Sequence, residues 1–301
     1  SYCDSEIAPK IDALEDGEIL PYEIMRHMAD TFGLREMMAP SQRGEDEGSD
    51  TGSRRDDAEK SEGTSSKGGG GLFGAGADPM MSHVIMMELS RVSPGLALSF
   101  GASIGLTGGT IMARGTREQK KRWGKPLFTL DKIGAWGLTE PGAGSDAFGS
   151  MTTRARPTGD GRWVLNGQKT YITNAPHADI CVVYAKLQVD GEPTGAFVVE
   201  AGPEGLTLGP PMAKMGMCES PTGEIFLEDV TLDGSHLLGG DPREQRRDAS
   251  RDQAKSTLKA ERSAMPAMAA GIVERCLEIC TRYVDEREQF GQPIGNFQAV
   301  Q

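Results

Sequence analysis

The stretch WGLTEPGAGSD, residues 136–146, begins like a strand, passes through glycine and proline turns, and ends in Ser145 and Asp146. A glycine-rich turn after a strand exposes backbone N–H groups, and with a serine hydroxyl these can bind an anion such as pyrophosphate. The same residues are typical of a plain turn between two strands, and no lysine accompanies them. The flanking sequence has to decide between the two interpretations.

Downstream of this stretch the hydrophobic period is that of strands. RWVLNGQKTYITN (162–174) and GEIFLEDVTL (223–232) alternate apolar and polar residues, and turn residues such as Gly159-Asp160-Gly161 separate the segments. Alternation broken by short turns predicts antiparallel strands. We therefore expect a small β barrel or sandwich as a central domain over residues 136–240.

Upstream of it the period is helical. DPMMSHVIMMELSRVSP (78–94) and GLALSFGASIGLTGGTIMARG (95–115) read as two apolar helices, and the small residues of the second favour close packing. GTREQKKRW then places Thr116 and Gln119 in a capping-box arrangement. These patterns predict an N-terminal helical domain over residues 1–135.

One segment of that domain has a different composition. Residues 41–71 contain no aromatic or branched aliphatic residue and carry charges of both signs. Such a segment cannot bury enough apolar surface to offset the entropy of ordering. We predict a disordered surface insertion here.

Beyond residue 240 the helical period returns. Pro266 predicts that this helix either begins near Arg262 or bends there, because proline lacks an N–H and crowds the preceding turn. The apolar residues predicted to share one face of it are Leu258, Met265, Met268, Ile272, Cys276, Ile279 and Tyr283. Residues 241–301 thus read as the start of a C-terminal helical bundle, and the whole chain as an α+β protein.

Composition narrows the function classes. Asp and Glu number 44 against 32 Lys and Arg, so the net charge of −12 argues against a protein that binds nucleic acid or anionic membranes. No apolar run approaches the roughly 18 residues of a membrane span. The five cysteines form no metal or disulfide pattern, and no two of the four histidines have metal-ligand spacing, so we expect no metal. A reducing, cytoplasmic location fits best.

Four motifs in order resemble the acyl-CoA dehydrogenase family: LTEPGAGSD (138–146), NGQKTYITNA (166–175), MGMCESPTGEIFLEDV (215–230) and REQFGQPIGNFQAVQ (287–301). The resemblance implies an N-terminal helical domain, a central β domain and a C-terminal four-helix bundle that hold FAD against an acyl-CoA thioester. The missing initial methionine and the absence of a helix stop after GNFQAVQ predict that the chain is truncated at the C-terminus and at the N-terminus.

The resemblance also implies a set of cofactor-binding residues. Trp136, Leu138 and Thr139 would lie along the flavin, and Gly144 and Ser145 would meet the pyrophosphate. Tyr171, where the family more often has Trp or Phe, would cover one face of the ring system, and Thr173 would hydrogen-bond it. Arg287, Phe290 and Gln298 would reach the FAD of a neighbouring subunit, which implies a homotetramer or homodimer. Taken singly, the last three also read as a solvated charge, a core residue and a surface amide.

The catalytic base has two possible positions in this family. LKAER (258–262) places Glu261 at the earlier position, with Arg262 beside it where the family's arginine approaches the substrate pocket or CoA. The alternative is a glutamate on a later helix beyond Gln301, in which case Glu261 is one more acid in a charged helix.

The implied reaction is α,β-dehydrogenation of an acyl-CoA to a trans-2-enoyl-CoA, with electrons passed to an electron-transfer flavoprotein. An oxygen-using acyl-CoA oxidase or flavin monooxygenase remains open, as does a truncated homologue that binds without chemistry. The expected location is cytoplasmic, or the mitochondrial matrix in a eukaryote.

Overall fold

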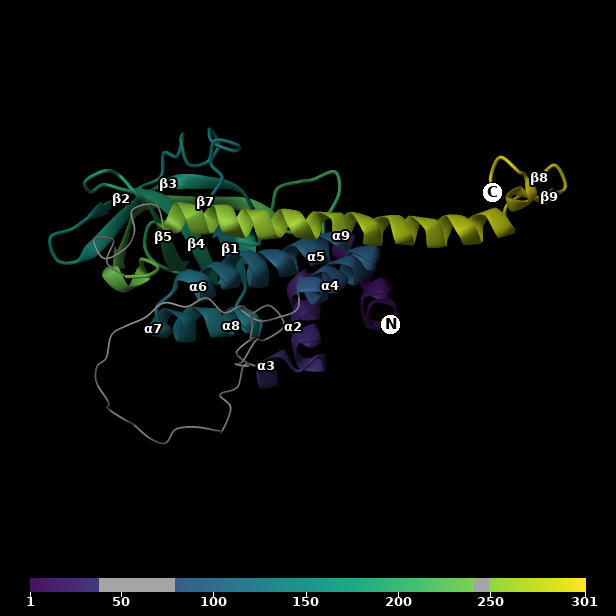
Figure 1. Cartoon of the computed structure of the whole chain (residues 1–301), viewed down its shortest axis with the longest axis horizontal. Coiled ribbons are helices and arrows are strands. Elements are labelled where there is room, and N and C mark those ends of the chain that lie inside the picture. Colours follow the sequence, from purple (N-terminus) through teal and green to yellow (C-terminus); the bar gives the residue numbers. More distant parts are fainter. Residues whose placement is uncertain (38–78, 241–248) are drawn as a thin grey trace, which may run out of the picture.

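The computed structural model describes residues 1–37, 79–240 and 249–301. The disordered insertion predicted at 41–71 lies entirely outside the described residues. Helices come first, a sheet follows, and one long helix crosses both (Figure 1). This order confirms the predicted α+β fold class.

The helices of the N-terminal part are α1 (Ile11–Glu15), α2 (Pro21–Thr31), α3 (Leu34–Met37), α4 (Pro79–Val92), α5 (Pro94–Phe100), α6 (Gly109–Arg114), α7 (Arg117–Gln119) and α8 (Lys125–Phe128). The π-helical segment Gly101–Gly108 joins α5 to α6. The strands of the main sheet are β1 (Gly134–Gly137), β2 (Arg154–Pro157), β3 (Arg162–Thr173), β4 (Ile180–Leu187), β5 (Thr194–Glu200), β6 (Leu206–Leu208) and β7 (Thr222–Asp233). The chain then continues through α9 (Ala249–Glu286) to the hairpin of β8 (Glu288–Gln289) and β9 (Gln292–Pro293).

Local sequence signals set two of the helix starts. Ser93 caps α5, because its hydroxyl accepts a hydrogen bond from the Leu96 amide at 3.2 Å. The capping box predicted at Thr116 is present: its hydroxyl accepts from the Gln119 amide, and the Gln119 side chain accepts from the Thr116 amide.

The apolar helix Pro94–Arg114 lies close against the first strand. The Gly134 amide donates to Ser103 Oγ at 2.9 Å. A Cβ placed on Gly134 would lie 2.7 Å from Thr107 Cβ, so only glycine allows this approach. By length and composition this helix could cross a membrane, so the expectation that no run reaches that length is wrong. Most of it is buried inside the protein, which makes the observation weak evidence for a membrane span.

The sheet is mixed, which corrects the expectation of a wholly antiparallel domain. The strands follow the order β1-β4-β2-β3-β7-β6, and β5 pairs with the other side of β4. β1 and β2 both pair with β4 in parallel, whereas every other pair in this sheet is antiparallel. The reason is topological: the β2–β3 hairpin separates β1 from β4 in the chain, and β4 returns in the direction of β1.

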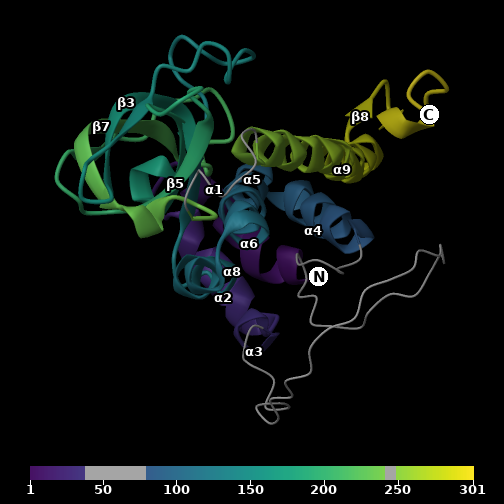
Figure 2. The same ribbon diagram turned by 60° about the vertical axis from the view of Figure 1, so that its left-hand side comes forward.

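Three apolar clusters hold the elements together. One fills the inside of the curled sheet, which Figure 2 shows beside the helices. A second lies among the N-terminal helices and includes Met268 of α9. The third lies where sheet and helices meet, and combines Trp136 and Leu138 with Ala254 of α9. The long helix thus contacts both parts of the molecule.

α9 differs from its prediction in two ways. Of the two alternatives at Pro266, a start near Arg262 is wrong, because α9 begins at Ala249 and continues through the proline, with packing on both sides of it. A bend at Pro266 stays a prediction. Beyond Gly271 the predicted apolar face is largely exposed: Ile272, Ile279 and Tyr283 are 39 %, 55 % and 56 % exposed. Cys276 and Cys280 are also exposed, so the packed face expected for them is not present.

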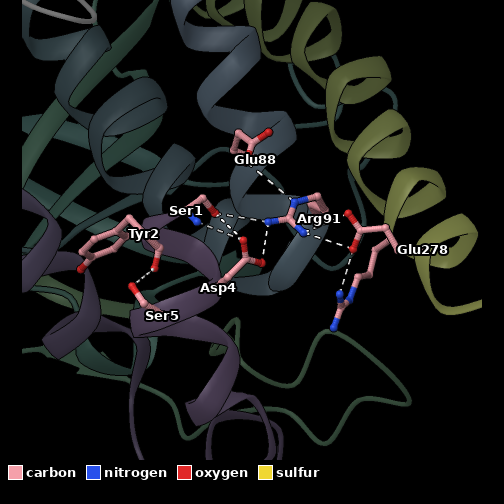
Figure 3. Close-up of polar contacts among 8 residues, drawn as sticks. Ser1, Tyr2, Asp4, Ser5, Glu88, Arg91 and Glu278 are labelled. Atoms are coloured by element: carbon pink, nitrogen blue, oxygen red, sulfur yellow. Dashed lines mark hydrogen bonds and ion pairs between the residues drawn. The ribbon is translucent and has the colours of Figure 1, made fainter. Parts of the chain in front are cut away.

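A buried arginine joins three distant segments. The Arg91 guanidinium on α4 lies between Asp4 Oδ1 at 2.7 Å and both carboxylate oxygens of Glu278 on α9 at 3.2 Å (Figure 3). We call Arg91, Asp4 and Glu278 the Arg91 cluster. Two carboxylates around one buried cation fix the N-terminal turn, α4 and α9 relative to each other.

Candidate functional site

The glycine-rich loop, residues 141–151, follows directly from β1 and a short extension of it. Gly144 and Ser145 are exposed, and a Cβ placed on Gly142 or Gly144 would meet nothing within 4 Å. In the described part of the chain, the amides of Gly144 and Ser145 donate no hydrogen bond. Free N–H groups beside an exposed hydroxyl, in open space, can accept an anionic group.

Two motifs 31 residues apart in sequence meet beside this loop. The Thr170 amide donates to the Thr139 carbonyl at 3.0 Å, so LTE and KTYIT lie side by side. Trp136 and Leu138 are buried, and Trp136 Nε1 donates to Thr110 Oγ1 at 3.1 Å. Their side chains therefore anchor the backbone that leads to Thr139. The Thr139 side chain itself is half-buried.

Tyr171 projects from the sheet at a break in the pairing of β3. The register between β3 and β7 shifts between Lys169 and Ile172, and Tyr171 takes a φ of +57°. Its side chain is 70 % exposed, whereas Thr173 two residues on is half-buried. A tyrosine held at positive φ costs roughly 1 to 3 kcal/mol, and such strain is concentrated at functional sites. The exposed ring is available to cover a flat ligand.

A buried ion pair that sequence reasoning missed lies under the loop. Lys169 Nζ lies 2.8 Å from Glu140 Oε1, and the two side chains are 0 % and 1 % exposed. Burial raises the pKa of Glu140, but Lys169 together with the hydrogen bonds from Thr152 and Thr153 outweighs it and lowers the pKa to about 2. Burial lowers the pKa of Lys169, and Glu140 opposes that shift. The only sequence signal was that both residues fall inside the two motifs.

Asn174 is a second residue that the sequence did not mark. Its side-chain amide donates to the carbonyls of Ser99 at 2.9 Å and Gly134 at 3.0 Å, and its Oδ1 accepts from Tyr22 Oη at 3.2 Å. The residue is fully buried with a φ of +68°. It therefore joins α2, α5 and β1 directly after Thr173, and fixes where β3 ends.

Glu261 lies half-buried on the inward side of α9. The residues on this face of the helix recur at spacings of three and four: Ala254, Leu258, Glu261, Met265 and Met268. Leu258 packs on the cluster that contains Trp136, and Met265 packs on the cluster of the N-terminal helices, so Glu261 stands between the two.

The surroundings of Glu261 favour its protonated form. Among the described residues it has no hydrogen-bond partner. Burial raises its pKa, and Arg262 partly opposes the shift. Arg262 itself is exposed. Nearer its start, α9 contacts the glycine-rich loop, because the Arg251 guanidinium lies 5.8 Å from the centre of the Phe148 ring.

The remaining three predicted residues are far from this site. Arg287, Phe290 and Gln298 are exposed at the end of the chain, and Phe290 is 94 % exposed. The sheet and the C-terminal hairpin lie at opposite ends of the molecule (Figure 1). At 1.5 Å per helical residue, Glu261 and Arg287 are roughly 40 Å apart. One copy of the chain does not bring them together.

These features fit an elongated anionic cofactor with a flat ring, as FAD is. The amides of Gly144 and Ser145, which donate no hydrogen bond within the described ranges, suit a pyrophosphate. The hydroxyls of Thr139 and Thr173, which make no hydrogen bond within the described residues, and the exposed ring of Tyr171 suit a polar aromatic system.

Comparisons with known proteins point to one family. The family models for the acyl-CoA dehydrogenase N-terminal, middle and C-terminal domains match residues 69–131, 135–230 and 251–301. A 3-(aryl)acrylate reductase of Clostridium sporogenes is 39 % identical over 230 residues, which are 76 % of this chain and 59 % of that protein. The CarC subunit of the caffeyl-CoA reductase–Etf complex of Acetobacterium woodii is 38 % identical over 231 residues, again 76 % of this chain and 59 % of that protein. The chain thus spans about three fifths of the length of these relatives.

Solved structures agree with the family models. Butyryl-CoA dehydrogenase from Megasphaera elsdenii superposes with a TM-score of 0.79 at 28 % identity, covering 99 % of this chain and 70 % of that one. An acyl-CoA dehydrogenase from Bacillus anthracis complexed with FAD gives a TM-score of 0.79 at 31 % identity, covering 99 % of this chain and 45 % of that one. Matched in order by all three domain models, this chain belongs to the acyl-CoA dehydrogenase family.

Proposed function

We propose that the protein to which this chain belongs binds FAD and dehydrogenates an acyl-CoA thioester to a trans-2-enoyl-CoA. The observation that carries the proposal is the hydrogen bond from the Thr170 amide to the Thr139 carbonyl, since it joins two motifs beside an open glycine-rich loop. The FAD complex of the Bacillus anthracis relative supports the cofactor.

FAD, when bound, would supply the acceptor for the β-hydride of the substrate. The amides of Gly144 and Ser145 would bind its pyrophosphate, and the hydroxyls of Thr139 and Thr173 would bind polar atoms of the ring. The exposed Tyr171 ring would cover one face and exclude water from it.

Glu261 would act as the base. A carboxylate that has lost hydration and has no hydrogen-bond donor is a better proton acceptor near neutral pH, because burial raises its pKa. Its carboxylate would take the α-proton of the thioester. Arg262, next to it and exposed, would bind an anionic group of CoA.

We further propose a homodimer or homotetramer. Arg287, Phe290 and Gln298 can serve a flavin site of this kind only in a second copy, because roughly 40 Å of helix separate Arg287 from Glu261. For the electron acceptor we propose an electron-transfer flavoprotein, which the name of the Acetobacterium woodii complex supports. The free cysteines of the chain support a reducing location, the cytoplasm or a mitochondrial matrix.

A second candidate is the reverse reaction, reduction of an arylacryloyl thioester. The names of the Clostridium sporogenes and Acetobacterium woodii relatives favour it. The same Glu261 would then donate its proton to the α carbon, and a raised pKa serves that role as well.

The test uses the full-length protein loaded with FAD under anaerobic conditions. We expect butyryl-CoA to bleach the flavin absorbance, and the bleached form to persist when air is admitted. Fast reoxidation by air would indicate an oxygen-using relative instead. Bleaching by dithionite followed by reoxidation with cinnamoyl-CoA, without any response to butyryl-CoA, would favour the reductase.

The role of Glu261 is tested with Glu261→Gln, which keeps the shape and removes the basicity. We expect FAD and acyl-CoA to bind as before and the bleaching rate to fall about 100- to 10,000-fold. Glu274→Gln, an exposed position on the same helix, is the matched control and should change nothing. An undiminished rate in Glu261→Gln would place the base elsewhere in the full protein.

A further inference from the structure

The two ends of the glycine-rich loop are closed by a single carboxylate. Glu140 stands before the loop, and Thr152 and Thr153 stand after it. The Glu140 carboxylate accepts five hydrogen bonds: from Lys169 Nζ, from the amide and hydroxyl of Thr152, and from the amide and hydroxyl of Thr153. We call Glu140, Thr152, Thr153 and Lys169 the loop neck.

Lys169 connects the loop neck to the segment after β1 that carries Thr139. Besides Glu140, its ammonium donates to the Leu138 carbonyl at 3.3 Å. The lysine stem passes under β1, since a Cβ on Gly137 would lie 3.3 Å from Lys169 Cγ. Because the lysine is fully buried, it cannot itself touch a ligand in the loop. Its contribution passes through Glu140 and Leu138.

Among the described residues, the other side-chain hydrogen bonds of the loop lie in its second half. The Ser150 hydroxyl donates to Asp146, Lys186 Nζ donates to the Gly149 carbonyl, and Arg154 donates to the Met151 carbonyl. Its internal backbone hydrogen bonds are the reciprocal pair between Glu140 and Ala143 and the bond from the Ser150 amide to the Asp146 carbonyl. Ala143, Ala147 and Met151 are buried, but the residues that would meet a phosphate are exposed. A loop with few internal bonds is ordered mainly by what fixes its ends.

Stability alone does not account for this arrangement. Replacing a buried ion pair by apolar residues of similar volume is often neutral or stabilising, because desolvating two charges costs as much as their attraction returns. What a carboxylate offers here, and an apolar residue does not, is acceptors for four donors from the far end of the loop.

We propose that Glu140 and Lys169 are positioning residues, which hold the glycine-rich loop in its phosphate-accepting conformation before FAD binds. The inference rests on the proposed FAD function and adds residues to the site that touch no cofactor. A preformed loop binds more tightly, because the entropy of ordering it is lost during folding rather than on binding.

The experiment compares Glu140→Gln with wild type. A glutamine has one acceptor oxygen and one NH₂ group. In one orientation its NH₂ group faces the donors of Thr152, and in the other it faces those of Thr153 and Lys169. We expect the Kd for FAD, measured by quenching of flavin fluorescence, to rise about tenfold. In the apo protein the Thr152 and Thr153 amides should exchange hydrogen faster.

Glu278→Gln in the Arg91 cluster is the control, since it weakens the ion pairs of another buried charge, Arg91, far from the loop. It should lower the thermal stability and leave the FAD Kd within about twofold of wild type. An equal loss of FAD affinity in both variants would overturn the proposal, because general destabilisation would then explain it.

Thr152→Val gives a test that does not depend on the folding of Glu140→Gln, since the Thr152 side chain is exposed. It removes one hydroxyl bond to Glu140, and we expect FAD affinity to fall about threefold and to recover in Thr152→Ser. Unchanged affinity in Thr152→Val and Glu140→Gln overturns the positioning role while the FAD function stands. A wild-type protein that binds no FAD overturns both.

Discussion

α9 and α4 approach each other closely at Gly271, and Gly271→Ala should separate them. A Cβ at this position would lie 2.1 Å from the Met87 carbonyl oxygen and 3.0 Å from the Arg91 amide nitrogen. Non-bonded atoms attract only near about 3.5 Å, and backbone atoms cannot rotate away as a side chain can. Overpacking costs up to roughly 3 kcal/mol, and alanine regains roughly 1 kcal/mol over glycine in a helix. The free energy of unfolding should fall by about 2 kcal/mol.

Urea denaturation of wild type and variant at neutral pH measures this change. Gly105→Ala is the matched control: it is also a helical glycine, but a Cβ there meets nothing within 4 Å. The control should gain roughly 0.5 to 1 kcal/mol from helix propensity alone. A Gly271→Ala protein as stable as wild type would refute the reasoning, and so would an equal loss in both variants.

Three further predictions concern the site. Asn174→Ala removes three buried hydrogen bonds and should lower the free energy of unfolding by roughly 3 kcal/mol, whereas Asn166→Ala on the surface should cost less than 1 kcal/mol in the same urea titration. The folded-state pKa of Glu140 is about 2, against an ordinary value of 4.5. The ionised carboxylate should therefore contribute about 3 kcal/mol of stability above pH 4.5, and this contribution should be lost as the pH falls towards 2. Acid titrations of unfolding should show this loss in wild type and not in Glu140→Gln. Ser145→Leu should leave the melting temperature unchanged, because the residue is exposed, and should abolish FAD retention on gel filtration; normal flavin content would remove Ser145 from the site.

Features set by neighbouring residues were predictable from the sequence. The capping box at Thr116 and Gln119 spans three residues, and the structure contains it. The succession of helices, strands and helix follows from hydrophobic period alone. The same holds for the glycine-rich loop, because glycine and proline mark turns wherever the chain folds.

Features set by distant residues were not predictable from the sequence. Periodicity cannot tell that β4 returns parallel to β1, because that depends on where the β2–β3 hairpin packs. Glu140 and Lys169 are 29 residues apart, and each alone reads as an ordinary surface charge. At Pro266 the local rule against proline in a helix was outweighed by packing on both sides of it. The φ of Tyr171 follows from a register shift between two strands, which no local pattern encodes.

The Arg91 cluster has a consequence for synthesis on the ribosome. Arg91 and Glu278 are 187 residues apart in the chain. At a synthesis rate of about 5 to 20 residues per second, Glu278 is added roughly 10 to 40 s after Arg91. During that interval α4 has neither the carboxylate nor the apolar side of α9 to cover it, although the N-terminal turn that supplies Asp4 has already emerged. The N-terminal helices therefore complete their tertiary contacts only after the sheet has been made, and a chaperone that shields α4 would act in that interval.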